Sequence, residues 1–426
     1  MAQGPHLIFD KSSLQILTDD QAAMLDNFYT SNIVPVFFVE CLADLEKTMV
    51  RMKSTPEQLV GALAVKTPDM QPSSNVFHLE LIQGEILGKF DLRTIFHRPC
   101  IRGGEKVELG ESKGIVFRRT EEEEALRRWK RKEFLGVERE IAKVWRQTIS
   151  QIDFDDMVRI VRDRIGPWRK PASLEDARSL TDTIIDNLDQ VWLLRFGLEF
   201  LRLPIDAVEP AVQGWIMTRR LRLRQHLPYF TFVLSINIFF CLVLPTQLLS
   251  GVKQSHQIDL AYLCYLPFCS VFTSRDKFHV QVAKLFLAPS QTFVHGDELQ
   301  NDLQKLVDRY AKLPQEVLDG GIFSFAGHPP DDEAFLTTRL WNKYCPFWKS
   351  GEAGILASQL DPELRKMLQA KEEARPDRHE SSFENLDQVT FTRNVAVKKG
   401  IFYRFPKNSI AEGEQEKEMR FEYRDC

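Results

Sequence analysis

Residues 259–276 read DLAYLCYLPFCSVFTSRD, and this stretch decides the predicted fold. The apolar residues from Ile258 to Leu266 predict a helix, which a proline ends. Residues 270–274 predict a buried strand, because aromatic and β-branched side chains follow one another there without a charge. The two acids of the stretch, Asp259 and Asp276, lie 276 − 259 = 17 positions apart, which fits one helix, one turn and one strand.

A similar pattern opens the chain, with an acidic residue directly after an apolar run. Leu7 to Phe9 predicts a buried strand that ends at Asp10. Ile33 to Val39 contains no polar residue and predicts a second buried strand, which Glu40 follows directly. Strands that alternate with helices are typical of an α/β fold, so we expect these strands to lie in one parallel sheet.

The rest of the chain predicts a mostly helical molecule. Thr120 and Glu123 form a capping-box pattern, and helices are expected from there to about Gln225, with prolines between them. The other expected elements are helices after Ser12 and Ser13 and over 18–29 and 298–310, short strands over 76–87, 106–117 and 285–287, and a hairpin over 389–405.

The composition indicates a folded globular protein of two or three domains. The chain has 426 residues, of which 43% are hydrophobic and 27% charged, so a sizeable core is expected. Its net charge, 56 − 60 = −4, demands no nucleic-acid partner, although a local basic groove remains compatible with it. The seven cysteines form no C-x-x-C pair and no secretory signal is recognised, so we expect reduced thiols and a cytoplasmic location.

One apolar segment, Tyr229 to Leu244, raises the alternative of a membrane span. It is shorter than the roughly 20 residues that a spanning helix needs. It also contains Ser235 and Asn237, and Pro245 closes it. We therefore expect a helix buried inside the protein and no membrane partner.

Four acidic residues are the candidate catalytic groups and metal ligands: Asp10, Glu40, Asp259 and Asp276. In open α/β sheets, ligands gather at the carboxyl ends of parallel strands, and a helix start can join them there. Several carboxylates in one pocket repel one another unless they are protonated or neutralised. Mg²⁺ and Mn²⁺ prefer oxygen ligands, and such an ion can activate water for attack on a phosphodiester. The pattern therefore predicts metal-dependent cleavage of a nucleic-acid backbone.

The order of these acids resembles that of PIN-like domains, a family of metal-dependent ribonucleases. Residues 8–13 (IFDKSS) are similar to the first strand and first aspartate of the family, and residues 35–40 (PVFFVE) to its second strand and glutamate. The best match is residues 259–262 (DLAY) followed by 271–276 (VFTSRD). The resemblance implies an endoribonuclease in which the four acids hold Mg²⁺ or Mn²⁺ and RNA is the substrate, with DNA left open as an alternative.

One departure from the family is large. Here 259 − 40 = 219 positions separate the glutamate from the third acid, where PIN domains usually have a few tens. We therefore expect an α/β fold, a PIN-like core with a parallel sheet, interrupted by a large, mostly α-helical insertion. The gap also leaves the identity of the glutamate open, with Asp44 and Glu46 as alternatives. The expected divisions are residues 1–50 and 251–315 for the two parts of the core, 51–250 for the insertion and 316–426 for a C-terminal extension.

Basic residues provide candidate substrate contacts. Lys11 and Lys277 each adjoin a proposed acid, and Arg219 and Arg220 belong to a basic cluster near the end of the insertion. An ordinary helix face, exposed to solvent and paired with nearby glutamates, is the alternative for such clusters. His279 is close to Asp276 in sequence, but we expect it to be a surface turn residue rather than a catalytic one.

Three functional hypotheses follow. The first is a metal-dependent endoribonuclease, and the second is an inactive PIN-like module that binds nucleic acid or protein. In the second, the acids have ordinary roles, such as Asp10 capping a helix. The third is a membrane-associated interaction protein that uses Tyr229 to Leu244. Residues 110–114 (GESKG) fit G-x-S-x-G, but the flanking sequence predicts a hairpin, so hydrolase chemistry is not expected there.

Overall fold

The structure is a computed structural model of the whole chain. It describes residues 4–68, 76–89, 92, 96–98, 105–109, 112–116, 121–151, 153–203, 208–217, 222–249, 256–349, 398–404 and 406–407.

A four-stranded parallel sheet is formed by strands from both parts of the predicted core, residues 1–50 and 251–315. Its strands are β1 (His6–Phe9), β2 (Thr30–Asn32), β5 (Val271–Ser274) and β6 (Thr292–His295). The order is β2-β1-β5-β6, and every neighbouring pair is parallel. With helices around this sheet the fold is α/β, as the sequence predicted. Strand β1 pairs directly with β5, more than 200 residues away.

The strand order reverses at β1. The chain passes from β1 to β2 on one side and later returns to β5 on the other side. The carboxyl end of β1 therefore lies at a switch point of the strand order, which is where ligands bind in open α/β sheets. In register, Phe9 lies opposite Thr273, and Ser274 lies opposite His295, so residues that follow β1, β5 and β6 share this edge.

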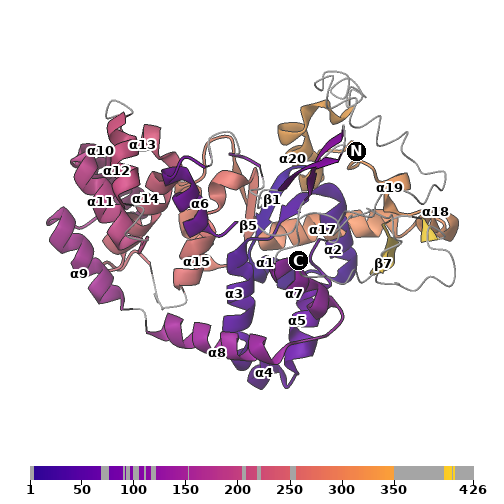
Figure 1. Cartoon of the computed structure of the whole chain (residues 1–426). Coiled ribbons are helices and arrows are strands. Elements are labelled where there is room, and N and C mark those ends of the chain that lie inside the picture. The colour runs from indigo at the N-terminus through magenta and orange to yellow at the C-terminus, as the bar shows by residue number, and fades with distance from the viewer. Residues whose placement is uncertain are drawn as a thin grey trace.

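Short helices pack around the sheet and connect its strands (Figure 1). α2 and α17 pack against each other, as do α3 and α15. The bounds are α1 (Lys11–Gln15), α2 (Asp19–Phe28), α3 (Pro35–Ala43), α4 (Leu45–Met52), α5 (Pro56–Ala64), α15 (His256–Leu263), α16 (Lys277–Val282), α17 (Gly296–Tyr310), α18 (Gln315–Asp319), α19 (Ile322–Phe325) and α20 (Leu336–Tyr344), with single 3₁₀ turns at Leu266–Phe268, Ala283–Leu285 and Pro346–Lys349.

The second apolar run forms a helix, so the strand predicted over Ile33–Val39 is wrong. Strand β2 is shorter and earlier, and α3 begins at Pro35. A proline in the first turn suits a helix because its missing N–H would have no partner there. A helix buried on most sides lacks the polar positions that reveal a 3.6-residue period, and it therefore imitates a buried strand. As a result, Glu40 lies near the end of α3 rather than after a strand.

Two shorter predictions also need correction. Residues 76–87 were expected to form a strand, but α6 (His78–Ile86) is a helix there. Residues 285–287 were expected to form another, but Leu285 ends the 3₁₀ turn at Ala283–Leu285, and the two residues after it are in no strand. The edge strand of the sheet is instead β6, whose four residues are too few to show an alternating pattern in the sequence.

The segment between the two halves of the sheet is mostly helical, as predicted. Figure 1 shows α9 to α14 gathered at one end of the molecule and α8 leading toward them. A short antiparallel hairpin precedes these helices. The bounds are β3 (Glu105–Leu109), β4 (Ser112–Val116), α7 (Glu121–Lys130), α8 (Gly136–Ser150), α9 (Phe154–Ile165), α10 (Leu174–Asn187), α11 (Gln190–Phe200), α12 (Val208–Met217), α13 (Leu223–His226) and α14 (Pro228–Val243).

The apolar segment forms α14 and is buried inside the protein, as predicted. The Glu85 carboxylate, only 8% exposed, caps its first turn from α6. The Glu85 oxygens accept hydrogen bonds from the backbone N–H groups of Tyr229 at 3.0 Å and Phe230 at 2.8 Å. In the part of the chain that the structure describes, no helix has both the length and the apolar character to cross a bilayer.

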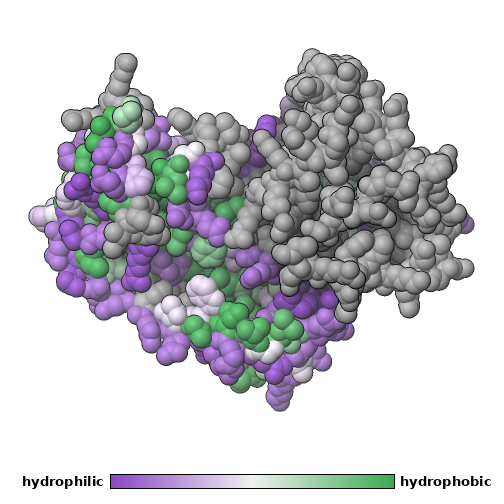
Figure 2. Space-filling model, in the orientation of Figure 1, coloured by the Kyte–Doolittle hydropathy of each residue, from purple (hydrophilic) through white to green (hydrophobic). Residues whose placement is uncertain are grey.

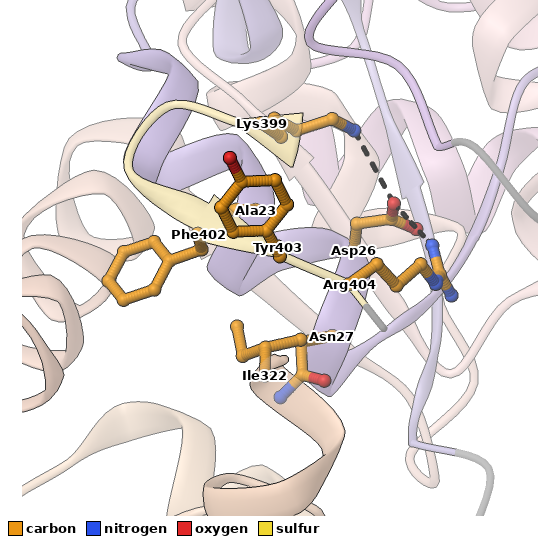
Figure 3. A pocket seen from close by; sticks show the side chains of 8 residues that line it. All are labelled: Ala23, Asp26, Asn27, Ile322, Lys399, Phe402, Tyr403 and Arg404. Atoms are coloured by element: carbon orange, nitrogen blue, oxygen red, sulfur yellow. Dashed lines mark hydrogen bonds and ion pairs between the residues drawn. The ribbon is translucent and has the colours of Figure 1, made fainter. Parts of the chain in front are cut away.

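A small C-terminal hairpin, β7 (Lys398–Lys399) and β8 (Phe402–Tyr403), docks on α2. Figure 3 shows Lys399 and Arg404 both directed at the carboxylate of Asp26. The Lys399 Nζ lies 3.4 Å and an Arg404 nitrogen 2.6 Å from the Asp26 oxygen Oδ2. The described residues of the hairpin predicted over 389–405 thus agree with that prediction, while residues 389–397 and 405 lie outside them.

Most large apolar side chains are inside the molecule, but one helix exposes several. On α8, Val137 is 59% exposed and Val144 is 62% exposed, and Ile141 lies between them in the helix. Figure 2 shows hydrophobic residues on the lower face of the molecule, where Figure 1 places α8 and α4. On α4, Val50 and Met52 are exposed as well.

Candidate active site at the carboxyl edge of the sheet

The four candidate acids come from four different elements that meet at this edge. Asp10 follows β1, Glu40 lies near the end of α3, Asp259 lies in the first turn of α15, and Asp276 caps α16 just after β5. The charge of Asp10 acts on both Glu40 and Asp259, and the charge of Asp276 acts on Asp259. The fold therefore brings Asp10, Glu40 and Asp259 within electrostatic range of one another, and Asp276 within range of Asp259.

The Asp10 carboxylate accepts three hydrogen bonds from within the protein. Its Oδ1 accepts from the backbone N–H of Ser13 at 2.9 Å, and its Oδ2 accepts from the hydroxyls of Ser12 at 2.7 Å and Ser274 at 2.6 Å. Burial by itself would raise the pKa of Asp10, but His279 and the serine hydroxyls outweigh it and hold the pKa below its ordinary value. Asp10 is the N-cap of α1, which is the ordinary role that the second hypothesis gave it, and this carboxylate stays ionised.

Glu40 reaches the same edge from α3. Its Oε2 accepts a hydrogen bond from the phenol of Tyr262 at 2.8 Å. Burial raises the pKa of Glu40 to about 8; the positive charge of Lys11 opposes this, and the negative charges of Asp10 and Asp259 add to it. At neutral pH, Glu40 is therefore mostly protonated in the absence of a bound cation.

Asp259 and Asp276 lie at the starts of two successive helices. Asp276 accepts a hydrogen bond from the backbone N–H of Phe278 at 2.7 Å, so it has a capping role. Burial raises the pKa of Asp259 to about 7; His279 opposes this, and the negative charges of Asp276 and Asp10 contribute to it. The pKa values of Asp259 and Glu40 are thus raised mainly by burial, and the neighbouring acids add to the shift.

His279 is fully buried beside the acids, so the surface turn position predicted for it is wrong. Its Nε2 lies 2.8 Å from the carbonyl oxygen of Asp259, which can only accept a hydrogen bond. Its Nδ1 lies 2.9 Å from the Ser274 hydroxyl, whose single hydrogen is used for the Asp10 carboxylate. Both ring nitrogens therefore donate, and the ring is an imidazolium 3.6 Å from an Asp10 oxygen.

The pKa of His279 agrees with this assignment. Burial alone would lower it, but Asp10 and Asp259 raise the pKa of the ring to about 9. Spacing along the chain did not reveal this residue, because His279 reaches the acids only through the turn of α16 and the pairing of β1 with β5. The one available signal was its position three residues after Asp276.

Lys11 lies at the same edge of the sheet, which we call the acidic edge after Asp10, Glu40, Asp259 and Asp276. Its ammonium donates to the Asp44 carboxylate at 2.7 Å and to the backbone carbonyl of Glu40 at 3.2 Å, and its side chain is 12% exposed. This pairing gives Lys11 a role in neutralising the protein's own acids, and its contact with substrate stays a prediction. Asp44, named above as an alternative to Glu40, lies on the rim of the cluster and contributes to the raised pKa of Asp259.

The other expected substrate contacts divide into two groups. Lys277 is exposed at the first residue of α16, next to Asp276. Arg219 and Arg220 lie outside the described residues. Their neighbour Arg224 pairs with Asp182 and Asp186 of α10, as expected for an ordinary ion-paired helix face.

The donor set at this edge suits a hard divalent cation, because carboxylate oxygens dominate it. The Ser13 hydroxyl, on the residue whose N–H binds Asp10, is buried without a hydrogen-bond partner. Within the described residues, however, no group of three His, Cys, Asp or Glu side chains is placed to hold a metal ion. The side chains thus have the chemistry for Mg²⁺ or Mn²⁺, but they would have to move to surround the ion.

Comparisons of the chain with protein-family models, with curated proteins and with solved structures found no match.

Proposed function

We propose that this protein is a PIN-like, metal-dependent endoribonuclease whose active site is the acidic edge. The observation that supports it best is the accumulation of acids from four elements at the switch point of a parallel sheet, with two pKa values raised toward neutrality. Perturbed carboxyl groups at such a switch point are typical of active sites. The parallel sheet, with β1 inside it, is compatible with the PIN-like core that the acid order implied.

In this proposal Glu40, Asp259 and Asp276 hold the cation together with Asp10. A bound Mg²⁺ or Mn²⁺ supplies a polarised water and offsets negative charge on the phosphodiester. Glu40 and Asp259 must lose their protons to bind it, so the affinity should rise with pH. Through Ser274, His279 fixes the orientation of the Asp10 carboxylate.

The first prediction tests this function with Asp276→Asn. Asparagine is an equally good helix cap, so the variant should keep α16 and the fold while losing a negative charge at the site. Wild-type protein should cleave labelled single-stranded RNA with Mn²⁺ and stop when EDTA is added. The variant should lose at least about a hundredfold in rate, in line with the loss of a group that acts on the transition state.

A matched control is Asp153→Asn, which changes the cap of α9 in the insertion in the same way. It should cleave RNA like the wild type. EDTA-resistant cleavage, or equal rates for Asp276→Asn and the wild type, would contradict the mechanism. Absence of cleavage of RNA and DNA, with no shift of the melting temperature by Mn²⁺, would favour the inactive binding module instead. The inactive module is supported by the hydrogen bonds of Asp10, because three of its acceptor positions are already occupied by groups of the protein.

A further inference from the structure

Arg275, the residue after β5, is a cation at the acidic edge whose hydrogen-bond donors are mostly unused. Its Nε donates to the Oδ1 of Asp297 at 2.6 Å. Within the described residues, its two terminal nitrogens have no hydrogen-bond partner. Lys11 and His279, by contrast, use their donors on acceptors of the protein itself. Arg275 therefore presents its remaining N–H groups to solvent.

Hydrogen bonds connect the backbone of Arg275 to Asp10. The N–H of Arg275 donates to the hydroxyl of Ser12 at 3.1 Å, and that hydroxyl donates to the Oδ2 of Asp10 at 2.7 Å. Ser274 directs its side chain at Asp10, whereas Arg275, the next residue, directs its own at the start of α17. Both residues lie at the carboxyl end of β5, so a strand of nucleic acid laid across this edge would pass from the acids to Arg275.

The Arg275 side chain is held in place at two points. Its stem lies against Gly296, where a Cβ would be only 2.5 Å from the Cγ of Arg275, and Asp297 holds its Nε. Because the guanidinium is planar, fixing one of its nitrogens fixes the direction of the other two. A side chain that is already ordered loses less conformational entropy when it binds a ligand. The guanidinium is therefore preorganised.

His295, the last residue of β6, adds a second donor beside this guanidinium. Its Nδ1 accepts from the backbone N–H of Asp297 at 3.2 Å, so in the neutral ring the proton lies on Nε2. The Asp297 carboxylate lies between the two side chains: Arg275 binds its Oδ1, and the His295 Nδ1 is 3.6 Å from its Oδ2. Both side chains are 40% exposed. Arg275 and His295 are thus neighbours that a ligand can reach.

We propose that Arg275 and His295 form a phosphate subsite, which binds a backbone phosphate of the RNA beside the phosphate that lies at the acids. The proposal rests on the proposed nuclease function and names residues that hold its substrate. Arginine suits this role because its paired N–H groups match the oxygens of a phosphate. The acids repel the RNA backbone until a cation binds, so a separate cationic group is needed to hold the strand. A contact to phosphate reads no base, so the subsite fixes position rather than sequence.

Binding can be measured apart from cleavage. Full-length protein, in EDTA and separately in Ca²⁺, is titrated into a fluorescein-labelled oligouridine of about eight nucleotides, with anisotropy as the readout. Arg275→Gln should weaken binding by about tenfold, the scale of one hydrogen bond to a charged group. It should also reduce the slope of log affinity against log salt by about 0.7. Arg275→Lys keeps the charge but not the paired N–H groups, so it should lose less affinity and keep the slope.

The matched control is Arg164→Gln, which removes an exposed arginine of the insertion. Arg164 is also ion-paired through one nitrogen, 2.9 Å from an oxygen of Glu199. This control should bind RNA like the wild type. His295→Asn keeps a good cap for α17 and removes the Nε2 donor, so it should weaken binding by about threefold. Melting curves of all variants check that each is folded.

A neutral linkage in the RNA shows which phosphate Arg275 holds. One phosphate of the oligouridine is replaced by an uncharged methylphosphonate, next to a 2′-O-methyl ribose, and the products of cleavage in Mn²⁺ are mapped. The wild type should cut poorly at a linkage one or two positions away, on one side of the neutral linkage only. Arg275→Gln should not show this local loss, because the group that senses the missing charge is itself missing.

The outcomes separate the phosphate subsite from the nuclease proposal. Binding that depends on Arg275, without cleavage in Mn²⁺, would support the subsite and overturn the nuclease. Cleavage in Mn²⁺, with the same affinity, salt slope and cleavage map for Arg275→Gln as for the wild type, would overturn the subsite alone. The subsite is also overturned if Arg164→Gln loses as much affinity as Arg275→Gln, if the wild type does not bind oligouridine, or if polyglutamate displaces it as well as unlabelled oligouridine does.

Discussion

At the scale of single residues, three groups at the acidic edge bind protons more tightly in the folded protein than outside it. The pKa of Glu40 is about 8 against an ordinary 4.5, that of Asp259 about 7 against 3.8, and that of His279 about 9 against 6.5. Burial is the main cause for the two acids, whereas the charges and hydrogen bonds of the neighbouring aspartates raise the histidine. All three are thus linked to the stability of the fold.

The sign of this linkage is the same for all three groups. Between the unfolded and the folded pKa, the folded state holds more protons, so stability falls as pH rises. The stabilising contribution of each group is fully present below the pKa that the group has in the unfolded state. It is lost as the pH rises through the pKa that the group has in the folded state. Without divalent metal, we expect the free energy of unfolding to fall between about pH 5 and pH 9.

Glu40→Gln tests this linkage. Glutamine is neutral at every pH and can still accept from Tyr262, so the variant should lose less stability than the wild type between about pH 4.5 and 8. At pH 8 it should be at least as stable as the wild type. The measurement is chemical unfolding at a series of pH values in EDTA, with the exposed Glu316→Gln as control. A wild-type stability that rises with pH across this window would contradict the assignment.

Sequence reasoning placed the acids at this edge because each adjoins a buried run or a helix start. It could not find the neutralising cations. Lys11 turns back onto Asp44, and His279 reaches Asp10 only because β1 pairs with β5. Such contacts depend on pairing between distant segments, which the order of residues along one chain does not specify.

At the scale of elements, the sequence did not distinguish a short buried helix from a buried strand. Ile33 to Val39 is continuously apolar and α14 is nearly so, and only the longer run was recognised as a helix. Length decided the case, since strands seldom exceed eight residues while helices often do. For the shorter run, Pro35 was the available signal and it was outweighed by β-branched composition.

The capping of α14 gives an element-scale prediction. Glu85→Ala would leave the backbone N–H groups of Tyr229 and Phe230 buried without their acceptor. Each such group costs about 1–3 kcal/mol, so we expect a loss of about 2–6 kcal/mol in the free energy of unfolding. Glu85→Gln, which retains one acceptor, should lose less.

The matched control for this cap is Glu80→Ala on the same helix, α6, where the side chain is exposed. It should change stability by no more than about 0.5 kcal/mol. Chemical unfolding followed by tryptophan fluorescence measures all three variants. Equal stability of Glu85→Ala and Glu80→Ala would show that the cap contributes little to holding α14 in the core.

At the scale of the whole molecule, two contacts join segments that are far apart in the sequence. The sheet joins residues 6–32 to residues 271–295, and the hairpin at 398–404 docks on α2, far from it in sequence. The first contact, in the sheet, was predicted, because the order of the acids implied that the two parts of the core pack together. The second was not, since a pair of two-residue strands has no periodicity and its partner, Asp26, carries no special pattern.

The docking of this hairpin depends on a buried cluster with two cations and one carboxylate. Asp26→Asn would leave Lys399 and Arg404 buried without their shared negative charge, and an uncompensated buried charge costs about 3–5 kcal/mol. Because the hairpin can detach locally, most of this cost should appear as local opening. Hydrogen exchange should accelerate at residues 398–404 while β1 and β5 keep their protection.

Gly400 offers an independent way to loosen the same contact. Its φ is +61°, and a Cβ there would lie 1.9 Å from an oxygen of Asp20, so Gly400→Ala combines backbone strain with a clash. Gly88→Ala is the matched control, because its φ is +64° but a Cβ would meet nothing within 4 Å. We expect faster exchange at 398–404 for Asp26→Asn and Gly400→Ala, but not for Gly88→Ala. If both hairpin variants also lost protection in β1 and β5, the hairpin would have to be part of the cooperative core rather than a separately docked element.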